Sequence, residues 1–431
     1  MESVPTPKKF WVQDGRIAQY PTALDSGGRV HGGQGCTICH GGVDGTADKA
    51  AAHAGMVGIP GGDTCSACHP ATVTLAASSL HTTLGGFPTV LGARVDFSNA
   101  TTQARFDKQC TKCHVANADA KAACGHCHVS VPGTAGGGLI AGHKFQRTPS
   151  TDSNCTACHG SRVKDEYYGL NGALLTRNRA ALPAGSPLLT GTLAPDVHKA
   201  AGKDCAFCHA GAEMHGSGAV AGIDRYGLTG TPECTTCHTP TVQTAGLHTD
   251  VHLAAMDCQV CHAQPYKSCF GCHTDVDASG VAFYRINEAD PTRAARQGTA
   301  TTLPAGDALM EFRVGKNPRF GEAGQKKYSL LRHAPVDADV FRYSGANEVT
   351  GLFPNLTAKP TWKHATPHSI ARVTAIQSAC GNCHGADHGK YWLTDPVTDA
   401  HGWVGADAAA QQAEQAANAG VVQGTAIPYF H

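Results

Sequence analysis

Partial alternation of apolar and polar side chains occurs in two short stretches in the second half of the chain. The segments GVAFYRIN (280–287) and LMEFRVGK (309–316) alternate enough to predict short β-strands. The Ala-rich segment AAAQQAEQAANAG (408–420) predicts a short helix before the C-terminal tail. Such patterns are scarce in residues 36–273, where Gly- and Pro-rich connections predict short helices joined by coil.

Composition changes this picture, because large core-forming side chains are rare. The chain has 431 residues, of which 51 are Gly, 6% are aromatic and 16% are charged, and its 41% apolar content includes 20 cysteines. Length alone allows about two or three domains, but some group other than Leu, Ile and Phe must fill the interior. The 34 basic and 34 acidic residues balance, which argues against a nucleic-acid binder, and no run approaches the roughly 18 apolar residues of a membrane span.

All 20 cysteines belong to ten copies of one pattern, Cys-x-x-Cys-His, with none left over. Nine copies lie within residues 36–273 and one stands apart near the C-terminus. The first cysteines of the ten copies are, in chain order, Cys36, Cys65, Cys110, Cys124, Cys155, Cys205, Cys234, Cys258, Cys269 and Cys380. The second cysteines are Cys39, Cys68, Cys113, Cys127, Cys158, Cys208, Cys237, Cys261, Cys272 and Cys383. The histidines that follow are His40, His69, His114, His128, His159, His209, His238, His262, His273 and His384. In the same order we call these motifs 1 to 10.

Cys-x-x-Cys-His is the attachment signature of c-type haem. Two thiols three positions apart on one helical turn reach both vinyl groups of a single porphyrin, and the His becomes an axial iron ligand. A lone Cys-x-x-Cys is typical of half a zinc site or a redox dithiol, but zinc, iron–sulfur or disulfide chemistry does not require His after every second Cys. The pattern therefore predicts ten covalently bound haem c groups.

Fifteen histidines remain besides the ten that end the motifs. This exceeds the ten sixth ligands that ten six-coordinate irons need. His53 and His143 each stand twelve residues before a motif, and Asp-Val-His-x-Ala-Ala recurs around His198 and His252, as in an internal repeat. A methionine more often fills core gaps, so bis-His ligation is favoured. We expect the sixth ligands to be His31, His53, His81, His143, His198, His215, His248, His252, His333 and His368. His126, within CGHCH, and the terminal His431 are left open as ligands of a neighbouring haem or subunit.

The c-type cytochrome motifs also bear on location. In the family that they resemble, haem is joined to the thiols outside the cytoplasmic membrane, which implies that the chain is exported. The opening MESVPTPKKFWVQDGR has no apolar segment of a signal peptide, so we interpret the sequence as a mature form. An extracellular or outer cell-surface location is expected, ahead of the periplasm.

Two later segments, RHAP (332–335) and PTWKHATPHSIARVT (360–374), resemble the C-terminal part of large multihaem cytochromes of metal-respiring bacteria. The resemblance covers roughly a third of the chain and is weaker than the haem motifs. It favours His368 over His364 as a ligand. It implies a multihaem cytochrome c fold: mostly coil with short α-helices wrapped around a chain of stacked haems, and little β structure.

We divide the chain into four consecutive regions on this basis. They are a four-haem region (1–130), a five-haem region (131–273), a haem-poor segment that includes short strands (274–379), and the tenth haem with the tail (380–431). The Gly-rich stretch 131–142 marks the first seam.

The expected function is electron transfer through closely spaced bis-His haems. The family resemblance implies extracellular electron transfer, with other redox proteins, identical subunits in a polymer, or an extracellular acceptor as partners. One alternative is an oxidoreductase of nitrite, hydroxylamine or tetrathionate with one open haem; the variant Cys-x-x-Cys-Lys that marks some of those haems is absent. Another alternative is a periplasmic electron shuttle.

Overall fold

A computed structural model describes about half of the chain, in several separate stretches. These are residues 12–13, 16–17, 36–58, 60–91, 97–109, 124–128, 146–156, 159, 163–169, 193–216, 226, 231–239, 247–265, 274–276, 282–284, 312–333, 360–399 and 408–427. The cysteines of motifs 3 and 9 lie outside these residues, as do the predicted ligands His31 and His143.

The contacts group the chain into two units that interleave along the sequence. Unit 1 comprises residues 1–86, 104–160 and 204–232, and unit 2 comprises residues 87–103, 161–203 and 233–431. The sequence-based division into four consecutive regions differs from this arrangement, because residues 161–203 group with the C-terminal half rather than with the motifs on either side.

The described residues of unit 1 form mainly very short helices, several of which contain the Cys-x-x-Cys-His motifs. Side-chain caps define their starts: Asp48 accepts a hydrogen bond from Ala51 N at 2.7 Å, and Ser79 accepts one from His81 N at 3.0 Å. The elements are β1 (Val12–Gln13), β2 (Arg16–Ile17), α2 (Cys36–His40), α3 (Lys49–Ala52), α4 (Gly62–Ser66), α5 (Pro70–Ala76), α6 (Leu80–Thr83), α9 (Cys124–His128), the π-helix η2 (Thr151–Cys155), α13 (Cys205–Cys208) and α14 (Gly211–His215). Helices α7 (Gly86–Leu91) and α8 (Ala100–Gln109) cross the unit boundary.

Unit 2 combines similar short helices with a three-stranded sheet. Its helices are α11 (Asp165–Tyr168), α12 (Val197–Ala200), α15 (Cys234–Cys237), α16 (Asp250–Ala255), α17 (Cys258–His262), the 3-10 helix η5 (Ile376–Ser378), α19 (Gly381–His384), α20 (His388–Tyr391) and α21 (Ala408–Asn418). Its strands are β3 (Thr274–Val276), β4 (Ala282–Tyr284), β5 (Phe312–Lys316), β6 (Tyr328–His333) and β7 (Trp362–His364). Strands β4 and β5 lie inside the two alternating stretches, and α21 lies inside the Ala-rich segment.

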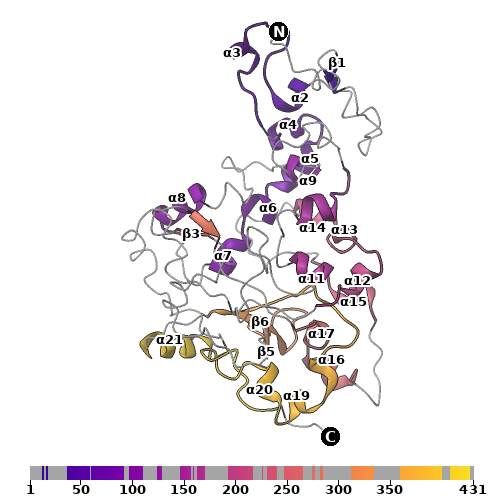
Figure 1. Ribbon diagram of the computed structural model, residues 1–431, viewed down its shortest axis with the longest axis vertical. Helices are drawn as coiled ribbons and strands as arrows, with labels where there is room; N and C mark the ends of the chain where they lie inside the picture. Colours follow the sequence, from indigo (N-terminus) through magenta and orange to yellow (C-terminus); the bar gives the residue numbers. More distant parts are fainter. Residues whose placement is uncertain are drawn as a thin grey trace. The chain divides into compact units, whose positions relative to one another are not determined.

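The sheet β5–β6–β7 is antiparallel and carries the hydrophobic core of unit 2. Phe312 pairs with Arg332 across β5 and β6, and His333 pairs with Trp362 across β6 and β7. The main core cluster gathers residues from the sheet, α17, α20 and the C-terminal segment, including Val260, Phe312, Leu330, Trp392 and Ile427. Figure 1 shows α17 beside β6, which it contacts. A motif helix, α17, is thus fixed on a conventional packed sheet.

A buried ion pair ties α11 to the same sheet. The Arg332 guanidinium on β6 bonds the Glu166 carboxylate, and both side chains are almost completely buried. The other oxygen of Glu166 accepts a hydrogen bond from His368 N at 2.7 Å. The Arg332–Glu166 ion pair joins positions 166 residues apart in the sequence, so it fixes the tertiary arrangement of unit 2 rather than a local turn.

Candidate functional site

Histidine side chains meet in pairs, and each pair has the same composition. Among the described residues, five pairs bring one motif histidine close to one histidine from outside the motifs. Three pairs lie in unit 2 and two in unit 1. They are His159 with His81 (ring centroids 6.0 Å apart), His128 with His215 (5.8 Å), His238 with His198 (6.0 Å), His262 with His248 (6.0 Å) and His384 with His252 (6.0 Å).

This separation is what two imidazoles adopt on opposite sides of one metal ion. Metal–imidazole nitrogen bonds are about 2.0–2.1 Å long, which places the ring centroids about 6 Å apart. The planes of the paired rings differ by 26° to 89°, and this spread is allowed because each ring rotates independently about its own bond to a shared ion. The five pairs therefore fit a metal held between two axial imidazoles.

Hydrogen bonds at Nδ1 orient many of these rings. When a carbonyl or carboxylate oxygen accepts a hydrogen bond from Nδ1–H, the lone pair that can bind a metal lies on Nε2. Among motif histidines, Nδ1 of His40, His128, His262 and His384 contacts a backbone carbonyl oxygen at 2.9, 2.8, 3.1 and 2.7 Å. Outside the motifs, Nδ1 of His53 and His252 contacts the carbonyl oxygens of Lys49 (2.7 Å) and Leu247 (2.9 Å).

Two further histidines are bonded by carboxylates instead of carbonyls. His198 Nδ1 lies 2.9 Å from Asp196 Oδ1, and His209 Nδ1 lies 3.0 Å from Glu213 Oε2. The hydrogen bond to Glu213 raises the pKa of His209, against the opposing effect of burial. Burial lowers the pKa of His81, so this ligand candidate favours the neutral imidazole that a metal requires.

The second cysteines of the motifs are accessible to an attached group wherever the structure describes them. Those that are exposed are Cys68, Cys127, Cys208 and Cys237, and those that are half-buried are Cys39, Cys261 and Cys383. The predicted haem-attaching residues Cys113, Cys158 and Cys272 lie outside the described residues, as do Cys110 and Cys269 and the side chain of Cys36. Their assignment as thioether positions stays a prediction from the motif.

Cysteines of different motifs also meet, which orders the motifs in space. The first thiols of motifs 2 and 4 are hydrogen-bonded, as are those of motifs 5 and 6 and those of motifs 7 and 8. The bond with Cys65 lowers the pKa of Cys124 to about 7. Helix α2 (motif 1) packs against α4 (motif 2), α9 (motif 4) packs against η2 (motif 5), and Cys383 of motif 10 acts electrostatically on Cys261 of motif 8. The described motifs thus form two series of neighbours, 1–2–4–5–6 in unit 1 and 7–8–10 in unit 2.

Large apolar side chains are exposed at the motifs and at the histidines paired with them. Ile38 and Phe207 lie between the two cysteines of their motifs and are 58% and 53% exposed. Val197 and Val251 directly precede His198 and His252 and are 39% and 47% exposed. Other exposed apolar side chains, among them Phe320 (62%) and Val373 (72%), lie outside the motifs in the sequence, so exposure alone does not distinguish these sites. At the motifs, a porphyrin face fits the exposed apolar side chains, the thiols and the paired imidazoles.

Other predicted ligands have different surroundings. His333 is buried and its Nε2 lies 3.1 Å from Glu414 Oε1, so Nδ1 is the nitrogen that it would offer a metal. His368 Nδ1 lies 3.6 Å from Glu166 Oε2, with its side chain 38% exposed, whereas His364 is buried in β7. The preference for His368 over His364 stays a prediction, as do the roles of His53 and His69.

One buried histidine was not singled out from the sequence. His388 on α20 is 5% exposed and stacks on Trp392 with ring centroids 5.3 Å apart. Burial lowers the pKa of its side chain. His388 follows motif 10 by only four residues, a spacing that occurs at none of the predicted ligands, so the sequence gives no reason to select it. Its burial against Trp392 is seen only in the structure.

The adjacent residues Tyr167 and Tyr168 contact α12 and the segment that follows it. The hydroxyl of Tyr167 donates to the carbonyl oxygen of Lys203 at 2.5 Å, and Lys199 Nζ lies 4.7 Å from the centroid of the Tyr168 ring. These two side chains brace the segment that carries His198.

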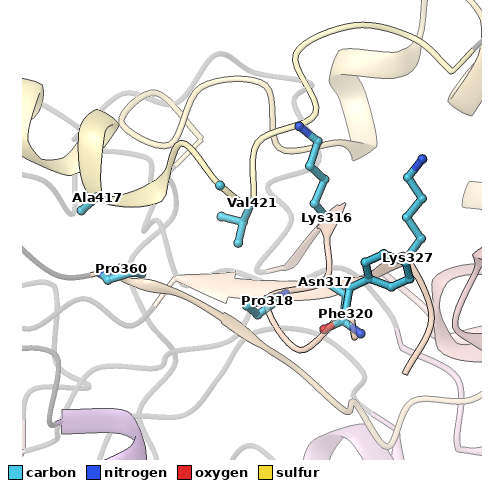
Figure 2. Close-up of a pocket in the computed structure, with 9 residues that line it drawn as sticks. Lys316, Asn317, Pro318, Phe320, Lys327, Pro360, Ala417 and Val421 are labelled. Carbon is cyan, nitrogen blue, oxygen red and sulfur yellow. The ribbon is translucent and has the colours of Figure 1, made fainter. Parts of the chain in front are cut away.

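A surface pocket lies beside the sheet, away from the histidine pairs. Figure 2 shows it at the turn after β5, with Lys316, Phe320, Lys327 and Val421 on its walls. Its volume is ≈ 460 Å³, and its lining residues include neither histidine nor cysteine. Elsewhere in the described ranges, no group of three or more His, Cys, Asp or Glu side chains has the arrangement of a metal site. In the part of the chain that the structure describes, the imidazole pairs are therefore the candidate metal-binding sites.

Comparison with family models, curated proteins and solved structures found no match to this chain. No helix in the described ranges combines the length and apolar character needed to cross a bilayer.

Proposed function

We propose that the protein is an electron-transport protein that binds ten haem c groups through its Cys-x-x-Cys-His motifs. The observation that carries this proposal is the set of five imidazole pairs, each formed by one motif histidine and one other histidine at 5.8–6.0 Å. A disulfide site gives no reason for a second imidazole to face a motif. A Cys2His2 zinc site does use two imidazoles, but it also brings two thiolates to the same ion, and no group of three or more His, Cys, Asp or Glu side chains has that arrangement in the described ranges. Haem c, when bound, alternates between ferric and ferrous iron and so carries one electron per group.

The residues of the chain have separable tasks in this function. Each cysteine pair would hold one group covalently, and the motif histidine and a histidine from another segment would ligate its iron. Two imidazoles are available at each of the five described pairs, which favours electron transfer over binding of a substrate at those irons. Backbone carbonyls and carboxylates at Nδ1 hold the imidazoles in orientation and tune their basicity.

The contacts between motifs favour transport over isolated redox sites. First cysteines of neighbouring motifs are hydrogen-bonded in both series, so haem groups attached to them would lie close to one another. A series of adjacent carriers suits an exported conduit that passes respiratory electrons outward. Its partners are other redox proteins, identical subunits or an extracellular acceptor, as the family resemblance implies.

Removing one imidazole of a pair tests the proposal. The variant His215→Ala takes away the residue that faces His128 of motif 4. We expect the purified haem-loaded protein to gain a high-spin ferric signal from one haem in ten by electron paramagnetic resonance, and to bind one cyanide per chain. The unmodified protein should be low-spin at the five described pairs.

The matched control is His126→Ala, in the same helix α9 as His128. Its ring is not paired with a motif histidine among the described contacts, so we expect the spectrum to stay low-spin. Two results would refute the proposal: mass spectrometry showing fewer than ten thioether-linked haems in the unmodified protein, or His215→Ala and His126→Ala giving identical low-spin spectra. Turnover of nitrite or hydroxylamine by the unmodified protein would select the oxidoreductase instead.

A further inference from the structure

The imidazoles of the described pairs differ in what their Nδ1 atoms contact. Carbonyl oxygens contact Nδ1 of His128, His252, His262 and His384, whereas a carboxylate contacts Nδ1 of His198, the partner of His238. A carboxylate carries a full negative charge and accepts a stronger hydrogen bond than a neutral carbonyl. The pair His198–His238 is therefore electrostatically distinct from the others.

An internal repeat shows how the sequence creates this difference. The pattern Asp-Val-His-x-Ala-Ala occurs at 196–201 and again at 250–255, and in both copies the histidine faces a motif histidine. In the first copy Asp196 is the N-cap of α12: its Oδ1 accepts from His198 N at 2.7 Å and contacts the Nδ1 of the same residue at 2.9 Å. The helix start places the carboxylate beneath the imidazole.

In the second copy the helix begins one residue earlier. Thr249 is the N-cap of α16, so Asp250 falls in the first turn, where it is exposed to solvent. His252 Nδ1 contacts the Leu247 carbonyl oxygen at 2.9 Å instead. The same aspartate, two residues before the same kind of histidine, contacts the ring in one copy and not in the other.

Asp196 is also fixed in place from its other side. Its side chain is 2% exposed, and Oδ2 accepts a hydrogen bond from Ile370 N at 2.7 Å. Three hydrogen bonds therefore hold this carboxylate, and backbone N–H groups donate two of them. A charge held in a buried position acts on its neighbour with little screening by solvent.

We propose that Asp196 is a positioning residue that lowers the reduction potential of the iron held between His198 and His238. By drawing the Nδ1 proton towards itself, the carboxylate would make the imidazole a stronger electron donor to the iron. Stronger donation stabilises the ferric state relative to the ferrous state, because ferric iron carries one more positive charge. Glu213 acts in the same way on the motif histidine His209, at 3.0 Å. This inference rests on the proposed binding of haem. It adds that a carboxylate beside an axial histidine lowers the reduction potential of the iron at that site.

The test is Asp196→Asn in the full-length, haem-loaded protein. Asparagine also caps helices well, so α12 is retained while the negative charge is removed. In an electrochemical titration followed by absorbance, we expect one tenth of the haem signal to move to a more positive potential. We expect the equilibrium constant between the oxidised and reduced forms of this site to change on the order of tenfold, which for one electron corresponds to about 59 mV. One low-spin ferric signal should also change its g-values.

Asp250→Asn is the matched control, because it makes the same change in the sister repeat, where the carboxylate does not contact the ring. We expect its titration curve and g-values to be those of the unmodified protein. Glu213→Gln is an independent second variant, expected to shift a different tenth of the signal. The inference is overturned if Asp196→Asn titrates like Asp250→Asn while ten haems are present, and its extension to His209 is overturned if Glu213→Gln does so. Absence of haem from the unmodified protein would instead overturn the proposed function.

Discussion

Unit 1 and the sheet of unit 2 differ in how much apolar surface their side chains bury. Around β5–β7, twelve buried side chains form one core cluster and four more form a second. Among the described residues of unit 1, the buried apolar side chains are Ala76 and Phe106. The sheet is therefore stabilised by ordinary hydrophobic burial, whereas the described residues of unit 1 bury little apolar surface of their own. If the motifs bind haem as proposed, the porphyrins would supply apolar surface in unit 1.

The comparison explains why one chain contains both kinds of structure. Short helices of four to seven residues are marginal by themselves, because helix nucleation is costly and few hydrogen bonds are gained. In unit 1 such helices hold thiols and imidazoles and bury little else. In unit 2 the motif helix α17 rests on β6, and α19 lies next to α20. The sheet gives motifs 8 and 10 a support that does not depend on a cofactor.

The largest expected effect comes from withholding haem altogether. In a chain produced without haem attachment, amides of α4, α9 and α13 should lose essentially all protection from hydrogen exchange, because local helix stability is near zero. Amides of β5 and β6 should stay protected in the same sample. Exchange measured by mass spectrometry checks this, and equal protection of α9 and β6 would contradict the comparison.

A smaller effect is expected from breaking the ion pair that joins α11 to the sheet. The variant Arg332→Met leaves the Glu166 carboxylate buried without its counter-charge, which should cost about 3–5 kcal/mol of unfolding free energy. The denaturant dependence of exchange at β6 amides measures this cost. Protection of the unit 1 helices in the haem-loaded protein should not change.

The double variant that combines Arg332→Met with Glu166→Gln is the control for this prediction. Glutamine carries no charge yet keeps an oxygen that can accept from His368 N, so a large part of the loss should be recovered. If the double variant were as unstable as Arg332→Met, packing of the guanidinium rather than the charge would explain the loss.

The smallest effect concerns close packing within the sheet. A methyl group at Gly315 would lie 2.5 Å from Leu331 Cδ1 and 2.6 Å from the Val421 carbonyl oxygen. Gly315→Ala should therefore destabilise the sheet by about 1–3 kcal/mol through overpacking. Gly420→Ala, where a methyl group meets nothing within 4 Å, should change stability by less than about 0.5 kcal/mol. Thermal unfolding of the two variants side by side gives the comparison.

Part of this arrangement could be predicted from local sequence signals. The motifs define themselves by spacing, and the Asp-Val-His repeats mark His198 and His252, which the structure places opposite His238 and His384. Strand β5 follows from alternation. These features depend on residues within a few positions of one another, so a single sequence is enough to find them.

The remaining features depend on tertiary contacts that no local pattern encodes. Strand β6 is buried at all six positions, so it lacks the alternation that reveals a half-exposed strand. The pairing of Arg332 with Glu166, and of His252 with a motif 132 residues later, requires the folded chain. Whether an aspartate contacts the neighbouring ring depends on a one-residue shift of a helix start, which two nearly identical repeats do not reveal.

The exposed apolar side chains of unit 1 have a consequence for how the polypeptide behaves on its own. Ile38, Val43, Met56, Val57, Leu75 and Phe207 are each at least 40% exposed. A chain without attached groups would present these side chains to water and to other copies, and exposed apolar surface of this kind drives aggregation. If the motifs bind haem as proposed, the rate of attachment relative to aggregation would govern the yield of folded protein.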